Sequence, residues 1–436
     1  MKEFAQAVQG WANYLDRTQW YKLPDLEKIQ ELGLKRIVLH HAVQSPWFKT
    51  WIAQQGLQPK DLFTLEGLTK LRPFNKRNIQ DAGPDFFARN VPDVHKPVRE
   101  ISTSGSTGQP ITTKKTQMDQ VIWNSMTMRD HSWWGRNAEG QKLTAIKAGI
   151  KIQVEHVQWG MPMSMFCTTG PSQGLPVWMK LEEQLAAVEK FQPDIMILHA
   201  GVLRGFVTIW ERTGNYTLTN LKHCKNISDT VDQDLRDRFR AITGLEIEDN
   251  YSCSEVGTVA IQCPVSGLYH TMMETQIVEV IDPDGNPCKE GQEGRIVITD
   301  LYNTANPIIR YDIGDWAVVG GECGCGRVHK TFTKVLGRER NLLKLPDGTR
   351  FWPRAGRYEM QQVTNVRQWQ IVQHDYNDVE FRIVTDQELT PEQETKLKDI
   401  FSKAINGFAT VRITRYADAI PPNAGGKFEE SICYVK

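Results

Sequence analysis

Short apolar runs and amphipathic stretches of helical period alternate along the middle of the chain. Ile195–Leu198 is an apolar run with the length of a buried strand, and Asp232–Ala241 intersperses apolar residues among charged ones at helical spacing. Arg295–Thr299 is again strand-like, with β-branched residues in succession. Strands that alternate with helices predict sheets covered by helices. We therefore expect an α/β body.

The two ends of the chain show different patterns. Within the first hundred residues, helical patterns such as Lys60–Leu71 are interrupted by prolines, which predicts a helical entry segment. After Gly337, Val379–Val384 and Val411–Thr414 alternate with period two, and Thr390–Gln393 reads as the capping box of a helix between them. These patterns predict a small α+β domain. We place the domains at residues 1–338 and 339–436.

Length and charge limit the functional classes. A chain of 436 residues is long enough for two or three domains. Lys plus Arg and Asp plus Glu both number 52, so we expect neither nucleic acid nor an anionic membrane as a partner. The first 15 residues mix polar and apolar types, unlike a signal peptide, and no apolar run approaches the length of a membrane span. We expect a soluble, cytoplasmic protein.

The segment Ser102–Pro110 is rich in glycine and small hydroxyl residues. Glycine lets main-chain N–H groups approach an anion closely, and neighbouring hydroxyls add neutral donors. The segment matches neither the common phosphate loop of nucleotide hydrolases nor the Rossmann fingerprint. A solvated turn is the alternative interpretation. The candidate phosphate-binding residues are Ser104, Gly105, Ser106, Thr107 and Gly108.

Four further motifs follow in order along the chain. They are Tyr251–Glu255, Arg310–Asp315, Gly337 with Arg338, and Gly425–Lys427. Together with the glycine-rich segment they resemble the motifs of the adenylate-forming superfamily of acyl- and aryl-CoA ligases. Their residues are most similar to those of the phenylacetate-CoA ligase branch. The resemblance implies an ATP-dependent, AMP-forming enzyme that makes an acyl adenylate from a carboxylic acid.

The resemblance assigns roles to individual residues. It implies that Glu255 binds Mg²⁺, that Tyr251 lies against adenine beside Ser254, and that Arg338 contacts the ribose and phosphate region. Asp315 is implied to bind ribose, whose two hydroxyls suit a carboxylate with two acceptor oxygens. Without the resemblance, Glu255 reads as a helix cap and Asp315 as an ordinary turn residue.

Lys427 ends a loop rich in proline and glycine near the C-terminus. By resemblance its ammonium lies between the acyl carboxylate and the α-phosphate, on a mobile C-terminal domain, and stabilises the charge of the transition state. Two residues depart from the family pattern. Ser252 stands where glycine is usual, and Arg340 stands at the hinge where an acidic residue is usual.

The expected partners are a small carboxylic acid, aromatic or hydrophobic, and coenzyme A as the thiol acceptor. A carrier protein or an amine is the alternative acceptor, and a nucleotide-binding protein without activity is the alternative class. We include a homodimer as one of the assemblies that the chain is expected to form. Apolar residues after the glycine-rich segment are either acid-pocket residues or core, namely Trp133, Trp134, Met161, Met163, Met165 and Phe166.

Eight cysteines without a signal peptide favour free thiols over a disulfide framework. Cys323 and Cys325, separated by one glycine, suit a metal knuckle, and Cys263 with His270 completes a four-ligand set for structural Zn²⁺. His329 is an alternative to His270, and ordinary thiols are the alternative to a metal site. No residue is placed by the sequence to activate a cysteine as a nucleophile.

Overall fold

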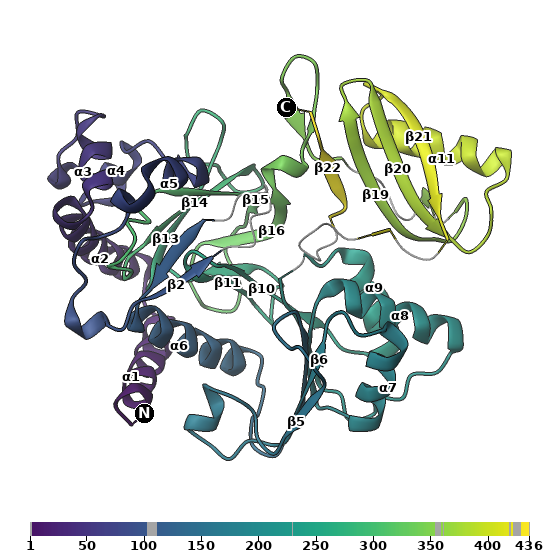
Figure 1. Ribbon diagram of the computed structural model, residues 1–436, viewed down its shortest axis with the longest axis horizontal. Coiled ribbons are helices and arrows are strands. Elements are labelled where there is room, and N and C mark those ends of the chain that lie inside the picture. Colours follow the sequence, from purple (N-terminus) through teal and green to yellow (C-terminus); the bar gives the residue numbers. More distant parts are fainter. Residues whose placement is uncertain are drawn as a thin grey trace. The chain divides into compact units, whose positions relative to one another are not determined.

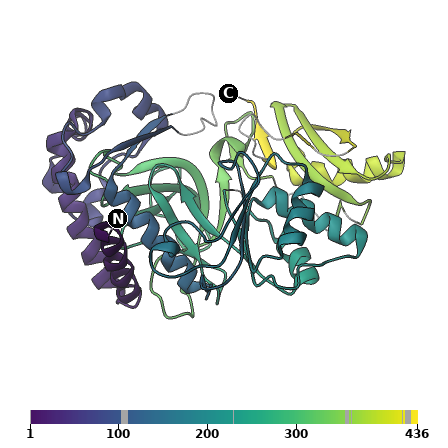
Figure 2. The ribbon, with the colours of Figure 1, turned by 60° about the horizontal axis from the view of Figure 1, so that its bottom comes forward.

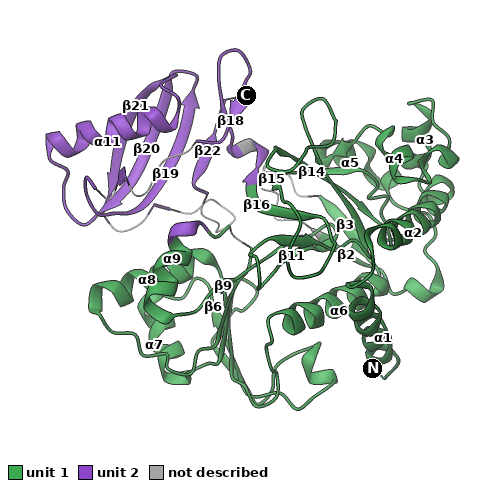
Figure 3. Cartoon of the chain, turned by 180° about the vertical axis from the view of Figure 1, so that it is seen from behind, with its two compact units in different colours: residues 1–231, 235–336 green, residues 232–234, 337–436 purple. Residues whose placement is uncertain are grey.

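The computed structural model describes residues 2–102, 111–228, 230–353, 359–360, 362–417, 420–421 and 429–435. The chain divides into two compact units (Figure 3). The large unit comprises residues 1–231 and 235–336, and the small unit comprises residues 232–234 and 337–436. The large unit contains helix-covered sheets and the small unit is α+β, so the expected fold class is confirmed.

A six-stranded sheet in the large unit has the order β5-β6-β4-β7-β8-β9, with all neighbours parallel except β5 and β6. Helices α7, α8 and α9 lie together beside it, and their apolar faces form one core with β7 and β8 (Figure 1). The predicted strand Ile195–Leu198 is β7, and the predicted helix Asp232–Ala241 lies at α9. The elements are β4 Leu143–Lys147, β5 Val154–His156, β6 Ser172–Pro176, β7 Ile195–Leu198, β8 His223–Asn226, β9 Ile247–Glu248, α7 Leu181–Phe191, α8 Ala200–Thr213 and α9 Gln233–Thr243.

An eight-stranded sheet carries most of the remaining core of the large unit. Its order is β10-β11-β12-β16-β15-β14-β13, and β1 pairs with β15. The predicted strand Arg295–Thr299 lies within β14. The strands are β1 Phe74–Asn75, β10 Asn250–Cys253, β11 Gly257–Gln262, β12 Tyr269–Thr271, β13 Gln276–Ile281, β14 Glu293–Asp300, β15 Tyr311–Val319 and β16 Thr331–Arg338.

Helices dominate the N-terminal part, as expected, but Lys60–Leu71 is not one helix. A 3₁₀ turn covers Pro59–Leu62, and the short helix α4 begins only after Thr64, whose hydroxyl caps it by accepting from the Gly67 N–H at 2.9 Å. The cap separates the two pieces, so this prediction was wrong. The helices are α1 Lys2–Thr18, α2 Leu23–Gln44, α3 Pro46–Ala53, α4 Leu65–Thr69, α5 Lys76–Ala82 and α6 Gln117–Trp133.

Helices α1 and α6 lie side by side in the large unit (Figures 1 and 2). A buried ion pair joins them to the turn between β12 and β13. Arg129 of α6 contacts the Glu274 carboxylate at 2.6 Å and also donates to the Leu15 carbonyl at the end of α1. Both side chains are almost fully buried. Burial alone would raise the pKa of Glu274, but Arg129 and His329 outweigh it and hold the pKa well below its usual range.

The small unit has a four-stranded sheet of order β21-β20-β19-β22, and helix α11 packs on it through Phe401, which stacks on Phe381. Val379–Val384 lies in β20 and Val411–Thr414 in β21. Thr390 and Gln393 form the predicted capping box at the start of α11. The elements are β17 Leu343–Lys344, β18 Arg350–Phe351, β19 Val366–Asp375, β20 Asp378–Thr385, β21 Thr410–Tyr416, β22 Ser431–Cys433 and α11 Pro391–Ala404.

Among the described helices, none combines the length and the apolar composition that crossing a bilayer requires.

Candidate functional site

Tyr251 of β10 and Asp315 of β15 meet in the large unit, although 64 positions separate them. The Tyr251 phenol donates to Asp315 Oδ2 at 2.5 Å, the length of a charge-assisted hydrogen bond. Asp315 directly follows Gly314 on β15, and the φ of 77° at Gly314 favours glycine. The structure thus brings together the two residues predicted to hold adenine and ribose.

Glu255 occupies the turn between β10 and β11, beside the exposed Ser254. Gly257, with a φ of 92°, ends this turn in a conformation that favours glycine. The Glu255 carboxylate is mostly buried, and the Tyr311 phenol lies 3.4 Å from its Oε1. Since Tyr311 begins β15 and Asp315 lies four residues further along, the predicted magnesium residue contacts the same strand that carries the predicted ribose residue.

The glycine-rich segment lies between β2 (Arg99–Ser102) and β3 (Thr112–Lys115). The candidates Ser104, Gly105, Ser106, Thr107 and Gly108 are outside the described residues. The two strands pair antiparallel, with Ser102 opposite Thr112, so the chain enters and leaves the segment at neighbouring positions. Lys115 at the end of β3 donates to the Glu255 carbonyl at 2.7 Å. This contact connects the strand after the segment to the predicted magnesium ligand.

The remaining predicted nucleotide residues belong to the small unit. Arg338 is the last residue of β16, next to Gly337 with its φ of 111°. Lys427 lies outside the described residues, before β22. The roles of Arg338 and Lys427 stay predictions.

Cys253 lies on β10 between these residues, and burial raises the pKa of its thiol, with the Glu255 charge adding to the effect. The thiol is therefore protonated near neutral pH. A protonated thiol is a poor nucleophile, which agrees with a site that works without a catalytic cysteine.

The residues considered for the acid pocket lie in different surroundings. Trp133 packs in a core with Leu15 and Met126, and its indole N–H donates to Gln19. Met161 is largely exposed, while Met163 packs beside other apolar residues. The structure thus gives Trp133 a packing role, and the acid-pocket role of the others stays a prediction.

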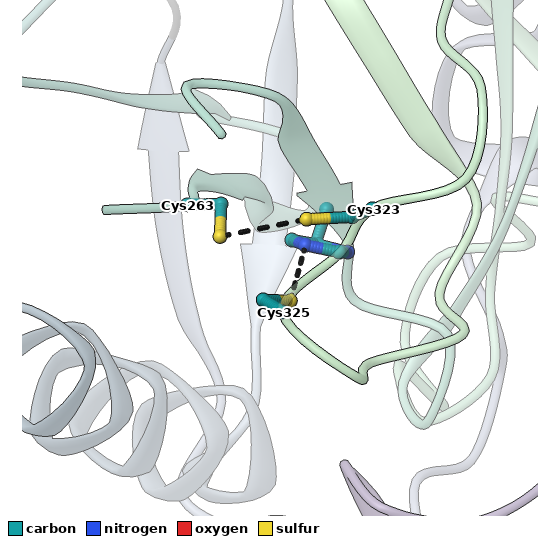
Figure 4. A group of neighbouring side chains, drawn as sticks. Cys263, Cys323 and Cys325 are labelled. Atoms are coloured by element: carbon teal, nitrogen blue, oxygen red, sulfur yellow. Dashed lines mark hydrogen bonds between the residues drawn. The ribbon is translucent and has the colours of Figure 1, made fainter. Parts of the chain in front are cut away.

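The four residues predicted to bind zinc converge in the large unit (Figure 4). Their ligand atoms, from Cys263, His270, Cys323 and Cys325, all lie within 4.8 Å of one another. His329, the alternative ligand, instead pairs with Glu274 at 3.2 Å. The geometry therefore selects His270.

The sequence analysis missed Lys115 and Tyr311 as site residues. Tyr311 was visible inside the Arg310–Asp315 motif, so its position gave a usable signal. Lys115 gave none, because its partner lies 140 positions away and is a main-chain carbonyl.

Comparison with known proteins supports this picture. No family model matches the chain. The phenylacetate-coenzyme A ligase of Thermus thermophilus is 26% identical over 333 residues, covering 73% of this chain and 71% of the relative. The phenylacetate-coenzyme A ligase of Pseudomonas putida is 28% identical over 339 residues, covering 73% and 72%.

The fold of the chain is that of a solved ligase. The crystal structure of 2-hydroxyisobutyryl-CoA ligase, in complex with 2-HIB-AMP, matches with a TM-score of 0.75 at 15% identity. The match covers 96% of this chain and 91% of that one. The chain is therefore similar in sequence to phenylacetate-coenzyme A ligases and shares the fold of 2-hydroxyisobutyryl-CoA ligase.

Proposed function

We propose that the chain is an ATP-dependent, AMP-forming acid–thiol ligase that converts a carboxylic acid into its acyl adenylate and then into a coenzyme A thioester. The observation that carries the proposal is the convergence of Tyr251, Glu255 and Asp315 on strands β10 and β15 and the turn after β10. One aromatic ring and two carboxylates in this arrangement suit a nucleotide with its metal ion.

Asp315 has the role of ribose acceptor in this proposal. Each carboxylate oxygen carries two lone pairs, so Asp315 can accept ribose hydroxyls while it holds the Tyr251 phenol. That phenol bond fixes the rotamer of the carboxylate before the nucleotide arrives. The Tyr251 ring then offers a flat apolar surface to the adenine.

Glu255 fits a magnesium ion by the chemistry of its donor, because Mg²⁺ prefers hard carboxylate oxygens and is bound through one or two carboxylates plus phosphates. Held there, Mg²⁺ would offset the negative charge of the phosphates. Tyr311 and Lys115 position Glu255, one at its carboxylate and one at its carbonyl. We assign the hydrogen-bond donors of Ser104–Gly108 and of Arg338 to binding the phosphates.

In the first half-reaction, a carboxylate oxygen of the acid attacks the α-phosphorus and pyrophosphate leaves. We assign Lys427 to the charge that develops there, since a preorganised cation stabilises it strongly. In the second, the coenzyme A thiolate attacks the acyl carbon, and AMP leaves with the carboxylate oxygen. We place the boundary between the nucleotide domain and a mobile Lys427 domain at residues 338 and 339.

The expected acid is aromatic or hydrophobic. The expected cofactors are ATP, Mg²⁺ and coenzyme A, together with a structural zinc ion apart from the nucleotide site. Coenzyme A is the expected acceptor of the acyl group. A carrier-protein thiol or an amine is the alternative acceptor, because either could react with the same acyl adenylate.

The test is a screen of pyrophosphate release over aryl and aliphatic acids, with and without coenzyme A. The proposal expects acid-dependent release and a thioester product when coenzyme A is present. Release without a thioester would move the acceptor to a carrier protein or an amine. ATP binding without release for any acid would mean a nucleotide-binding protein without ligase activity.

A further inference from the structure

Two loops and a strand of the large unit bring three thiols and one imidazole to a single point (Figure 4). Cys263 directly follows β11, and His270 is the middle residue of β12. Cys323 and Cys325 lie in the loop between β15 and β16. Among these side chains, those of Cys263 and His270 are almost completely buried.

Backbone hydrogen bonds hold Cys263 and His270 in position. Cys263 closes the turn after β11, because its carbonyl accepts from Gly267 at 2.9 Å and its N–H donates to Leu268 at 2.7 Å. His270 lies opposite Ile261 on one side and Thr331 on the other. The fold therefore fixes the backbone of two of the four ligand residues before any metal binds.

Two separations between ligand atoms match those of a tetrahedral metal centre. Bond lengths of about 2.3 Å for Zn–S and about 2.05 Å for Zn–N place two sulfurs about 3.8 Å apart and a sulfur and a nitrogen about 3.6 Å apart. The Cys263 and Cys323 sulfurs are 3.7 Å apart, and Cys325 Sγ is 3.4 Å from His270 Nε2. A disulfide would require about 2.05 Å. From this agreement, we propose that Cys263, His270, Cys323 and Cys325 bind one structural Zn²⁺.

The donor set selects the metal and its role. Thiolates with an imidazole in a tetrahedron favour zinc over magnesium, calcium or manganese, which prefer oxygen. Three cysteines and one histidine fill all four positions and leave none for substrate, as in structural zinc sites. The site also lies at the opposite end of β11 from the Glu255 turn, about 20 Å away at the rise of a strand.

Surrounding groups support the four ligands. The Ser266 hydroxyl lies 3.0 Å from Cys323 Sγ, and Trp133 of α6 packs edge-on against the His270 ring at 5.6 Å. The Arg327 guanidinium lies over Trp133 at 4.1 Å. Three thiolates around Zn²⁺ carry a net charge of −1, which this neighbouring cation offsets. Hydrogen bonds and packing of this kind orient metal ligands.

Zinc at this point would join segments that are far apart in sequence. It would tie the β11–β12 turn to the β15–β16 loop, which lacks regular structure between residues 320 and 330. It would also lie beside α6, next to the contact with α1. We therefore assign the metal to folding. The proposal does not depend on the ligase function.

The test measures metal content of the full-length protein purified without added metal. Elemental analysis should find about one zinc per chain, and X-ray absorption at the zinc edge should show three sulfurs at about 2.3 Å and one nitrogen near 2.05 Å. Cys323→Ser and His270→Ala should each bind zinc at least about tenfold more weakly in a chelator competition. Cys167→Ser, which changes a thiol outside the cluster, should keep full affinity.

The absorption spectrum needs only the native chain, so it decides the matter even where a variant fails to fold. The proposal would be overturned if the native protein contained no zinc, or if its zinc were bound by nitrogen and oxygen atoms only. A Cys263–Cys323 disulfide found by mass spectrometry would also overturn it. Unchanged zinc affinity in both ligand variants would do the same. A chain that binds zinc and releases no pyrophosphate would refute the ligase function and leave the metal site intact.

Discussion

Replacing Asp315 by asparagine tests the ribose assignment without disturbing the packing around it. The amide keeps an oxygen that can accept from Tyr251, so the short contact at 2.5 Å retains a partner. The negative charge is lost, and with it the charge-assisted bonds to the ribose hydroxyls. A hydrogen bond to a charged group contributes about 1.5–3 kcal/mol, so ATP should bind about 10-fold to 150-fold more weakly.

The assay is titration calorimetry of ATP and of 2′-deoxy-ATP with both proteins. The native chain should prefer ATP because Asp315 accepts from the 2′-hydroxyl, and the variant should lose most of that preference, as in a double-mutant cycle. Tyr251→Phe serves as the matched control, since it removes the phenol and keeps the carboxylate. An Asp315→Asn variant that retains native affinity for ATP and the native preference over 2′-deoxy-ATP would refute the ribose assignment.

Three further predictions address the metal, the core and pH. Lys115→Met should raise the Mg²⁺ concentration required for half-maximal pyrophosphate release by about tenfold, since a bond of about 1–1.5 kcal/mol to the proposed magnesium ligand is lost. Lys114→Met, on the same strand but over the Phe87 ring, should leave it unchanged, and equal effects would contradict the positioning role. Arg129→Met should destabilise the fold by about 3–5 kcal/mol in urea unfolding, because the buried Glu274 carboxylate loses its arginine partner. A loss below about 1 kcal/mol would contradict this role of the ion pair. Burial raises the pKa of Asp300 to about 7, and the charge of Asp119 adds to the effect. The folded chain therefore keeps a proton that the unfolded chain releases near about pH 4. The free energy of unfolding consequently falls as the pH rises from about 4 to about 7. Asp300→Asn should flatten that decline, and an unchanged pH profile would contradict it.

Local periodicity predicted the regular elements well where burial is one-sided or complete. Ile195–Leu198 is β7 as predicted, and the alternation of Val379–Val384 belongs to β20, where Phe381 faces the core of the small unit. The capping box at Thr390 was equally readable, because it is formed by side chains three residues apart. Lys60–Leu71 failed since the Thr64 cap outweighed the helical spacing.

Contacts between distant residues lay beyond the sequence. The pairing of Tyr251 with Asp315 depends on two strands of one sheet, and the bond from Lys115 to Glu255 ends on a main-chain atom that every residue possesses. Cysteine spacing left His270 and His329 as alternative ligands. Strand register decided between them, because it places His270 at the thiols while His329 meets Glu274.

The most direct test of the ligase reaction follows one oxygen atom. An acid that supports pyrophosphate release is labelled with ¹⁸O in its carboxylate and turned over with ATP, Mg²⁺ and coenzyme A. Adenylation of the acid predicts that AMP carries one ¹⁸O per thioester formed, because the carboxylate oxygen attacks the α-phosphorus and stays with AMP when the thiolate attacks the acyl carbon. Label in inorganic phosphate with ADP as the product, or AMP without label, would contradict adenylation of the acid.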